Sequence, residues 1–420
     1  ADPEAEPRRG DAAGGRAADR PPLPGTRRTP PAGRAGAGPA PMVLADTRVD
    51  GRLRVVAVRD DRVPVVELRL RIPLGARVWA RPGRDRRLAR WLAALLGDRG
   101  GAPRGTVLDV SADGEWLNAA GAAPPGRVPE WLAALGSVLA ADPGPWPDLP
   151  PAGPAGAPDA FSDAVIRALC LAGVATSDAA PARVPGPDGA LLVVVGPIDP
   201  DGVPPLARTA LGPWWALPGG LPAAPDPSGA DEPLLVPASG RTAHVTLWAA
   251  EDRAGPAEPA RHLATAALGG HYASRLVQGA VRRDGKGYMV HAGRDVLLGR
   301  PRIFARAAVP ADRLAGVAED MRAVLRGAAT EPPTDAEVAA VRDYCTAQLP
   351  LAFASPEALA DVLAATVSEQ RGPRWLTEAG TALREVGPDE VREAAASFAA
   401  AEFRTVVLTG DTGERGGDGA

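Results

Sequence analysis

Alternation of apolar and polar residues identifies the first strands of the chain. Residues 65–72 read Val-Val-Glu-Leu-Arg-Leu-Arg-Ile, and this period of two predicts a half-buried antiparallel strand. The apolar, β-branched runs at 53–58 and 190–196 predict two more strands. Between them, apolar residues recur at helical spacing. They predict helices over 86–96, 129–139 and 159–171.

A similar order of elements begins again after a Pro- and Gly-rich stretch. In this second half the pattern predicts strands at 244–249 and 405–411 and helices at 259–268, 310–327, 334–349, 356–370 and 388–400. The repetition is a weak internal duplication with a period of roughly two hundred residues. We therefore divide the chain into a disordered tail rich in Pro, Gly, Ala and Arg (1–42), an N-terminal domain (43–216), a linker (217–231), a C-terminal domain (232–415) and a short disordered tail (416–420).

Composition excludes several classes of function. Of the 420 residues, 45% are hydrophobic and 23% charged, which is typical of a globular protein, and the net charge of −4 offers no surface for nucleic acid or anionic membranes. No run approaches the roughly 20 apolar residues of a membrane span. Cys170 and Cys345 lie far apart in apolar helical contexts, which predicts buried, inert thiols. We expect a cytoplasmic protein, encoded by a GC-rich genome because Lys286 is its single lysine.

The second half contains the most specific motif. Residues 268–278 read Leu-Gly-Gly-His-Tyr-Ala-Ser-Arg-Leu-Val-Gln, and 285–290 read Gly-Lys-Gly-Tyr-Met-Val. Further on, 333–337 read Pro-Thr-Asp-Ala-Glu and 386–391 read Val-Gly-Pro-Asp-Glu-Val. This order resembles the C-terminal half of an M16 peptidase (insulinase or pitrilysin type, M16B-like), and the resemblance extends over about 45–415. It implies an α+β fold of two homologous halves in a clamshell, each a mostly antiparallel sheet with helices on one face.

The zinc motif of that family is absent from this chain. The family binds zinc through H-x-x-E-H, in which two histidines one helical turn apart are ligands and the glutamate is the general base. The matching helix here has Arg90, Ala93 and Ala94 at these three positions. The family's third ligand is a glutamate, and no glutamate occurs between Glu130 and Glu232. We therefore expect no metal and no cofactor in this chain.

The positions of the four histidines also argue against a zinc site of the family type, without any alignment. His244, His262, His271 and His291 all lie in the second half, and no metal-binding spacing joins them. A relocated zinc site would need converging ligands, so structural histidines are the simpler interpretation.

The resemblance also implies two residues that contact substrate. In two-subunit members of the family, the zinc-less subunit supplies an arginine and a tyrosine that hold the substrate carbonyl and its oxyanion. Tyr288 falls on the tyrosine position, whereas the arginine position is Val281 and Arg282 follows it. A one-residue shift would bring Arg282 into place. The alternatives are a tyrosine packed at the start of a strand and a surface arginine.

Three functions remain open after this reading. In the first, the chain is not catalytic alone but completes the substrate chamber of a heterodimer with an H-x-x-E-H subunit, which holds the zinc and processes a small peptide or leader peptide. In the second, it is a non-hydrolytic peptide-binding or scaffold protein. In the third, it is a homodimer with chemistry of its own. The first is favoured because the resemblance accounts for both the missing motif and Tyr288.

Overall fold

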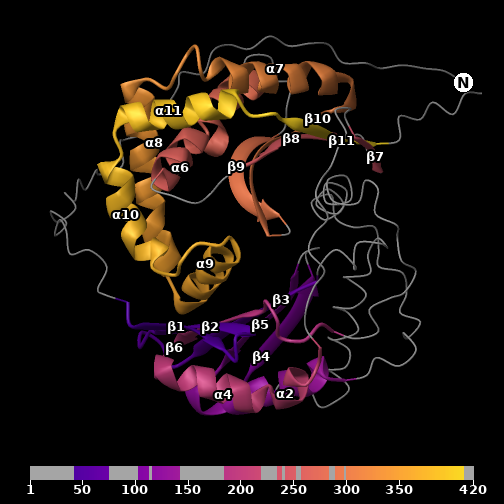
Figure 1. The fold of residues 1–420 in the computed structure, drawn as a ribbon, viewed down its shortest axis with the longest axis vertical. Coiled ribbons are helices and arrows are strands. Elements are labelled where there is room, and N and C mark those ends of the chain that lie inside the picture. The colour runs from indigo at the N-terminus through magenta and orange to yellow at the C-terminus, as the bar shows by residue number, and fades with distance from the viewer. Residues whose placement is uncertain are drawn as a thin grey trace, which may run out of the picture. The chain divides into compact units, whose positions relative to one another are not determined.

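The computed structural model describes residues 42–74, 103–112, 116–141, 184–218, 234–238, 242–251, 257–282, 289–297 and 299–410 (Figure 1). All of these belong to the unit Pro41–Ala420. The expected helices at 86–96 and 159–171, the tail up to residue 41, the tail at 416–420 and most of the expected linker lie outside the described residues.

The N-terminal sheet has six described strands. They are β1 (Leu44–Val49), β2 (Leu53–Arg59), β3 (Val66–Pro73), β4 (Val107–Ala112), β5 (Trp116–Ala123) and β6 (Leu191–Gly196). Their order is β1-β2-β6-β3-β5-β4, and only β2 and β6 pair in parallel. The strands expected at 53–58, 65–72 and 190–196 are confirmed as β2, β3 and β6.

The C-terminal sheet repeats the same arrangement with five described strands. They are β7 (Leu234–Ala238), β8 (Thr242–Ala250), β9 (Met289–Leu297), β10 (Arg300–Pro310) and β11 (Arg404–Gly410), in the order β7-β11-β8-β10-β9. The parallel pair β7–β11 occupies the place of β2–β6, and the other pairs are antiparallel. The expected duplication is therefore visible in strand order and direction, with β9 as the counterpart of β4 at the edge.

Helices of the first half cover one face of the N-terminal sheet. Helix α2 (Val128–Leu139) follows the short η2 (Pro125–Arg127), and α4 (Val203–Ala210) and α5 (Gly212–Trp215) follow η3 (Pro200–Gly202). Trp131, Leu132 and Leu135 of α2 are buried against alternate residues of β2, β3 and β6. The spacing of these three apolar residues, which predicts the helix, is thus explained by its buried face.

All five expected helices of the second half are confirmed. They are α6 (Glu258–Thr265) continued by the π-helix η4 (Ala266–Gly270), α7 (Leu314–Gly327) after η6 (Ala311–Arg313), α8 (Asp335–Gln348), α9 (Pro356–Ser368) and α11 (Pro388–Ala399). The expectation did not include the π-helix η5 (Val277–Arg282), η7 (Leu349–Phe353) and α10 (Trp375–Glu385). Helices α6, α7, α8 and α11 share one core with alternate residues of β8, β9 and β10.

The expectation of helices on one face only is wrong for the N-terminal sheet. Leu359, Leu363 and Val367 of α9 pack on its second face, against Val56 and Val193 (Figure 1). Strands β2 and β6 are therefore buried on both faces, which is why 191–196 is a continuous apolar run rather than an alternating one. One helix of the second half thus completes the core of the first.

No single helix in the described ranges is long and apolar enough to cross a membrane. Asp335–Phe353 and Pro356–Ser368 meet that criterion only as a pair, by length and composition alone, and they are bent by 120°.

Candidate functional site

The residues expected to contact substrate or to replace the zinc motif are largely outside the described ranges. Arg282 is the last residue of η5, but its side chain is not described. Tyr288 directly precedes β9 and lies outside the described residues, as do Arg90, Ala93 and Ala94. Their roles therefore stay predictions. The described part of the chain contains no group of three or more His, Cys, Asp or Glu side chains that could hold a metal ion.

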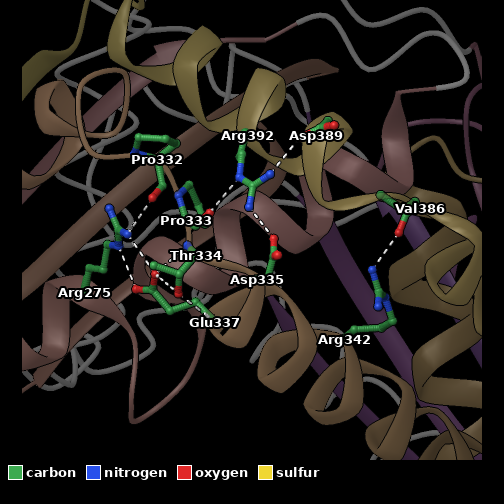
Figure 2. Close-up of polar contacts among 10 residues, drawn as sticks. All are labelled: Arg275, Pro332, Pro333, Thr334, Asp335, Glu337, Arg342, Val386, Asp389 and Arg392. Atoms are coloured by element: carbon green, nitrogen blue, oxygen red, sulfur yellow. Dashed lines mark hydrogen bonds and ion pairs between the residues drawn. The ribbon is translucent and has the colours of Figure 1, made fainter.

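Two of the stretches that carry the family resemblance meet at Arg275 (Figure 2). Its guanidinium binds both carboxylate oxygens of Glu337 at 2.8 Å and the carbonyl oxygens of Glu331 and Pro332. Glu337 also closes the capping box of α8 with Thr334. The Arg275 guanidinium, through its hydrogen bonds, lowers the pKa of Glu337 to about 2. This motif arginine therefore has a structural role: it fixes the start of α8.

Two further arginines join α8 to the segment around α11 (Figure 2). Arg392 donates to the carbonyl oxygen of Pro333 and forms ion pairs with Asp335 and Asp389. Arg342 donates to the carbonyl oxygen of Val386 at 2.6 Å. The polar residues of these motifs thus hold the helices of the second half together.

The first glycine of the motif, Gly269, lets a π-helix approach strand β9 closely. A Cβ at Gly269 would lie 2.5 Å from the Ala292 side chain and 2.8 Å from its backbone nitrogen. We expected from the sequence that Gly269 and Gly270 end a helix, and η4 does end at Gly270. The contact with Ala292 gives Gly269 a second role, because no side chain fits there. π-Helices occur frequently at functional sites.

A groove of about 640 Å³ opens beside β9. Figure 1 shows β9 as the last strand of its sheet. One wall is the strand itself, and the other walls come from α6 and η4, the end of α8, η7, α9 and the start of α10. The volume falls within the range of roughly 300–1,000 Å³ that is usual for ligand sites. The lining residues are His262, Thr265, Ala266, Gly270, His291, Ala292, Gly293, Arg294, Tyr344, Cys345, Gln348, Leu349, Leu351, Ala352, Val362, Glu369, Arg371 and Leu376.

A chain of buried charges fixes one end of this groove. Arg294 on β9 binds Glu251 at 2.8 Å and Glu258 at 2.5 Å, and Glu258 also pairs with Arg371 at 3.0 Å. The Arg294 side chain is only 2% exposed. Burial alone would lower its pKa, but the hydrogen bonds and charges of Glu251 and Glu258 outweigh burial and raise it. Glu258 therefore connects the strand wall to the α9–α10 connection, which contributes Glu369 and Arg371 to the lining.

The α9–α10 connection is held at a second point as well. Gln370 adopts a left-handed backbone (φ 64°), and its Nε2 donates to the carbonyl oxygen of Gly299 at 2.7 Å. Gly299 lies in the turn between β9 and β10. Both Arg371 and Gln370 thus fix this wall of the groove relative to the β9–β10 hairpin.

Burial keeps two titratable groups of the lining, His291 and Cys345, neutral. Burial, helped by the charge of Arg306, lowers the pKa of His291. Burial raises the pKa of the Cys345 thiol to about 11. The expectation of a buried, unreactive thiol is confirmed for Cys345, while Cys170 lies outside the described residues. The charged side chains among the lining residues with ion pairs, Arg294, Arg371 and Glu369, are thus already paired with one another or with Glu251 and Glu258.

Residues 183–344 match the sequence profile of the "Peptidase M16 inactive domain". The fold agrees with that match over most of the chain. A crystal structure of a peptidase M16 inactive domain from Pseudomonas fluorescens is 15% identical with a TM-score of 0.63, over 88% of this chain and 98% of that one. The chain has an M16-type fold.

Other solved structures share the M16-type fold at similar distance. A protease from Helicobacter pylori is 13% identical with a TM-score of 0.60, over 87% of this chain and 99% of that one. A chain of Complex III2 from Candida albicans is 12% identical with a TM-score of 0.59, over 86% and 94%. No curated protein sequence matches the chain.

Within this M16-type fold, the groove was not predicted from the sequence. Its polar residues Glu251, Glu258, Arg294 and Arg371 are spread over 121 positions, and the sequence alone gives no sign that they meet. A signal for the strand wall did exist. Residues 300–310 contain the apolar, partly β-branched run Ile-Phe-Ala-Arg-Ala-Ala-Val after a glycine, which is consistent with a hairpin strand paired to β9.

Proposed function

We propose that this chain is the zinc-less subunit of a two-subunit M16-type peptidase, in which it binds peptide and completes the active site of a zinc-bearing partner. The observation that carries the peptide-binding part of the proposal is the groove along the edge strand β9. The M16-type fold and the match to the inactive domain support the non-catalytic role. The residues Arg90, Ala93 and Ala94 at the positions of the zinc motif agree with it.

The geometry of β9 suits an extended peptide. Pro301 of β10 lies opposite Val296 and has no N–H to donate. In an antiparallel pair the bonded and non-bonded positions alternate, so the peptide groups of Ala292 and Arg294 face away from β10. Both residues line the groove. An extended segment placed there adds a strand to the sheet, a common mode of peptide recognition.

Tyr288 immediately precedes this strand, and Arg282 ends the π-helix that packs near it. In the proposed complex, Tyr288 and Arg282 face the zinc of the partner, which its H-x-x-E-H motif holds. They grip the substrate carbonyl and its oxyanion, for which a phenol and a guanidinium are suitable donors. We propose a small peptide or leader peptide as substrate and the cytoplasm as the location.

The experiment is co-expression with an H-x-x-E-H subunit, ideally one encoded by an adjacent gene, followed by a peptide cleavage assay. We expect the complex of both subunits to cleave the peptide and neither subunit to cleave it by itself. Tyr288→Phe should lower kcat by about 10²- to 10³-fold, the usual effect of losing an oxyanion donor. Tyr272→Phe removes the same hydroxyl from an exposed tyrosine and is the control. Unchanged turnover by Tyr288→Phe, or stoichiometric zinc in the purified chain by itself, contradicts this assignment.

A second candidate is a scaffold or peptide-binding subunit without any role in hydrolysis. The similarity to a chain of Complex III2, which is a multi-subunit assembly, favours it. This alternative predicts peptide binding or assembly without a zinc-bearing partner. Co-purification followed by a cleavage assay separates the two functions.

A further inference from the structure

The walls of the groove beside β9 differ in chemistry from its charged end. Residues Leu349 and Ala352 of η7, Val362 of α9 and Leu376 of α10 contribute apolar surface, and the ring of Tyr344 joins them from α8. We infer that the groove selects extended peptides that place an uncharged, apolar side chain against this wall. This inference rests on the proposed function and adds the class of peptide that the chain recognises.

The charges of the groove argue against a charged peptide side chain. Arg294 is shared by two carboxylates, and Arg371 is held by Glu258 and lies 3.6 Å from Glu369. An incoming carboxylate would have to displace one of these partners, and an incoming ammonium would have to lose its water without gaining an unshared carboxylate. Both processes cost free energy in a buried site. An apolar side chain displaces no ion-pair partner and loses no water bound to a charge.

The rim of the groove carries an exposed apolar patch. Of the seven large apolar side chains that are exposed in the described part of the chain, Leu351 (66%) and Tyr344 (40%) line the groove. These two side chains add exposed apolar surface to the groove, and exposed apolar surface beside a concave site favours an interaction.

The other sheet provides an internal comparison. Strand β4 is the counterpart of β9, and Val107 on it is 62% exposed, close to the value for Leu351. No groove-lining residue comes from β4. Val107 is therefore a matched position, equally exposed and apolar and also beside a sheet edge, but away from the groove.

The test uses the full chain and a set of short peptides, blocked at both ends, that differ only at a central Leu, Lys or Asp. Fluorescence anisotropy gives the affinities, and hydrogen exchange of β9 amides reports where each peptide binds. We expect the Leu peptide to protect β9 and to bind about tenfold or more tightly than the Lys and Asp peptides, because burying an unpaired charge costs at least about 1.4 kcal/mol.

Leu351→Asp should weaken the Leu peptide about tenfold, whereas Val107→Asp should leave its affinity unchanged. Both positions are exposed, so neither variant is expected to unfold, and circular dichroism checks this. Equal affinities for the three peptides, or equal effects of the two variants, overturn the inferred selectivity while leaving peptide binding intact. If none of the peptides protects β9, the peptide-binding function itself fails.

Discussion

The side chain of Glu337 receives more polar contacts than an ordinary surface carboxylate. It accepts from Arg275 and from the backbone N–H and hydroxyl of Thr334, all within 3.0 Å. These donors favour the ionised form and hold its pKa at about 2, below the usual 4.5. Because the folded pKa is the lower one, the stabilisation is complete above about pH 4.5 and is lost as the pH falls towards 2.

We therefore expect Glu337→Gln to destabilise the protein by about 1 kcal/mol at pH 7, a value reduced for solvent screening because the side chain is 37% exposed. The difference between variant and wild type should shrink as the pH is lowered from 5 to 3. Urea denaturation across this range measures it. Glu130→Gln removes the partner of Arg127 in an exposed pair and serves as control. A pH-independent difference would mean that Arg275 does not lower the pKa of Glu337 as described.

At the scale of elements, the sequence predicts the helices and strands whose apolar residues recur regularly. It does not predict strands that lack this regularity. Strand β3 and helix α2 show clear alternation or helical spacing, so their sequences define them. Strand β5 reads Trp-Leu-Asn-Ala-Ala-Gly-Ala-Ala, which lacks β-branched residues, and it is a strand only because β3 and β4 pair with it. Strand β1 had a usable signal in the sequence, because the dipeptide Asp50-Gly51 is typical of a hairpin turn. In the structure both residues have positive φ in the turn to β2.

The groove could not be predicted from the sequence because its walls also depend on tertiary contacts. It is built where β9, η7 and the α9–α10 connection approach one another, and these contacts depend on the tertiary fold. The motif glycines, by contrast, were visible in the sequence, and the structure gives their reason. Gly269 lets η4 approach the backbone of Ala292, and that approach sets the position of β9 beside the groove.

We expect Gly269→Ala to destabilise the protein by about 1–3 kcal/mol, because a methyl group would overlap Ala292. Gly316→Ala, in α7, meets no atom within 4 Å and should instead stabilise by about 0.5–1 kcal/mol through its better helix propensity. Thermal unfolding of the two variants gives the comparison. Equal shifts of Tm would show that the π-helix can move away from β9 without cost.

At the scale of the whole molecule, α9 connects the two sheets. By sequence it follows η7 and shapes the groove through Val362, whereas its Leu359 and Leu363 pack in the core of the N-terminal sheet. Each of these buried leucines contributes about 1.5–3 kcal/mol from burial. Loss of that packing should therefore weaken the first half and the groove together, although the two are far apart in the sequence.

Hydrogen exchange of Leu363→Ala tests this coupling. We expect the protection of β6 amides to fall by about 2–5 kcal/mol, because the deleted methyl groups leave a cavity against Val193 and its neighbours. Leu383→Ala makes the same deletion on α10, in the core of the C-terminal sheet, where it should first lower the protection of β8 and β10. If both variants weaken β6 equally, the two halves unfold as one unit and α9 has no special part in joining them. If Leu363→Ala leaves β6 unchanged, α9 does not stabilise the N-terminal sheet, and the groove wall that it carries is independent of the first half.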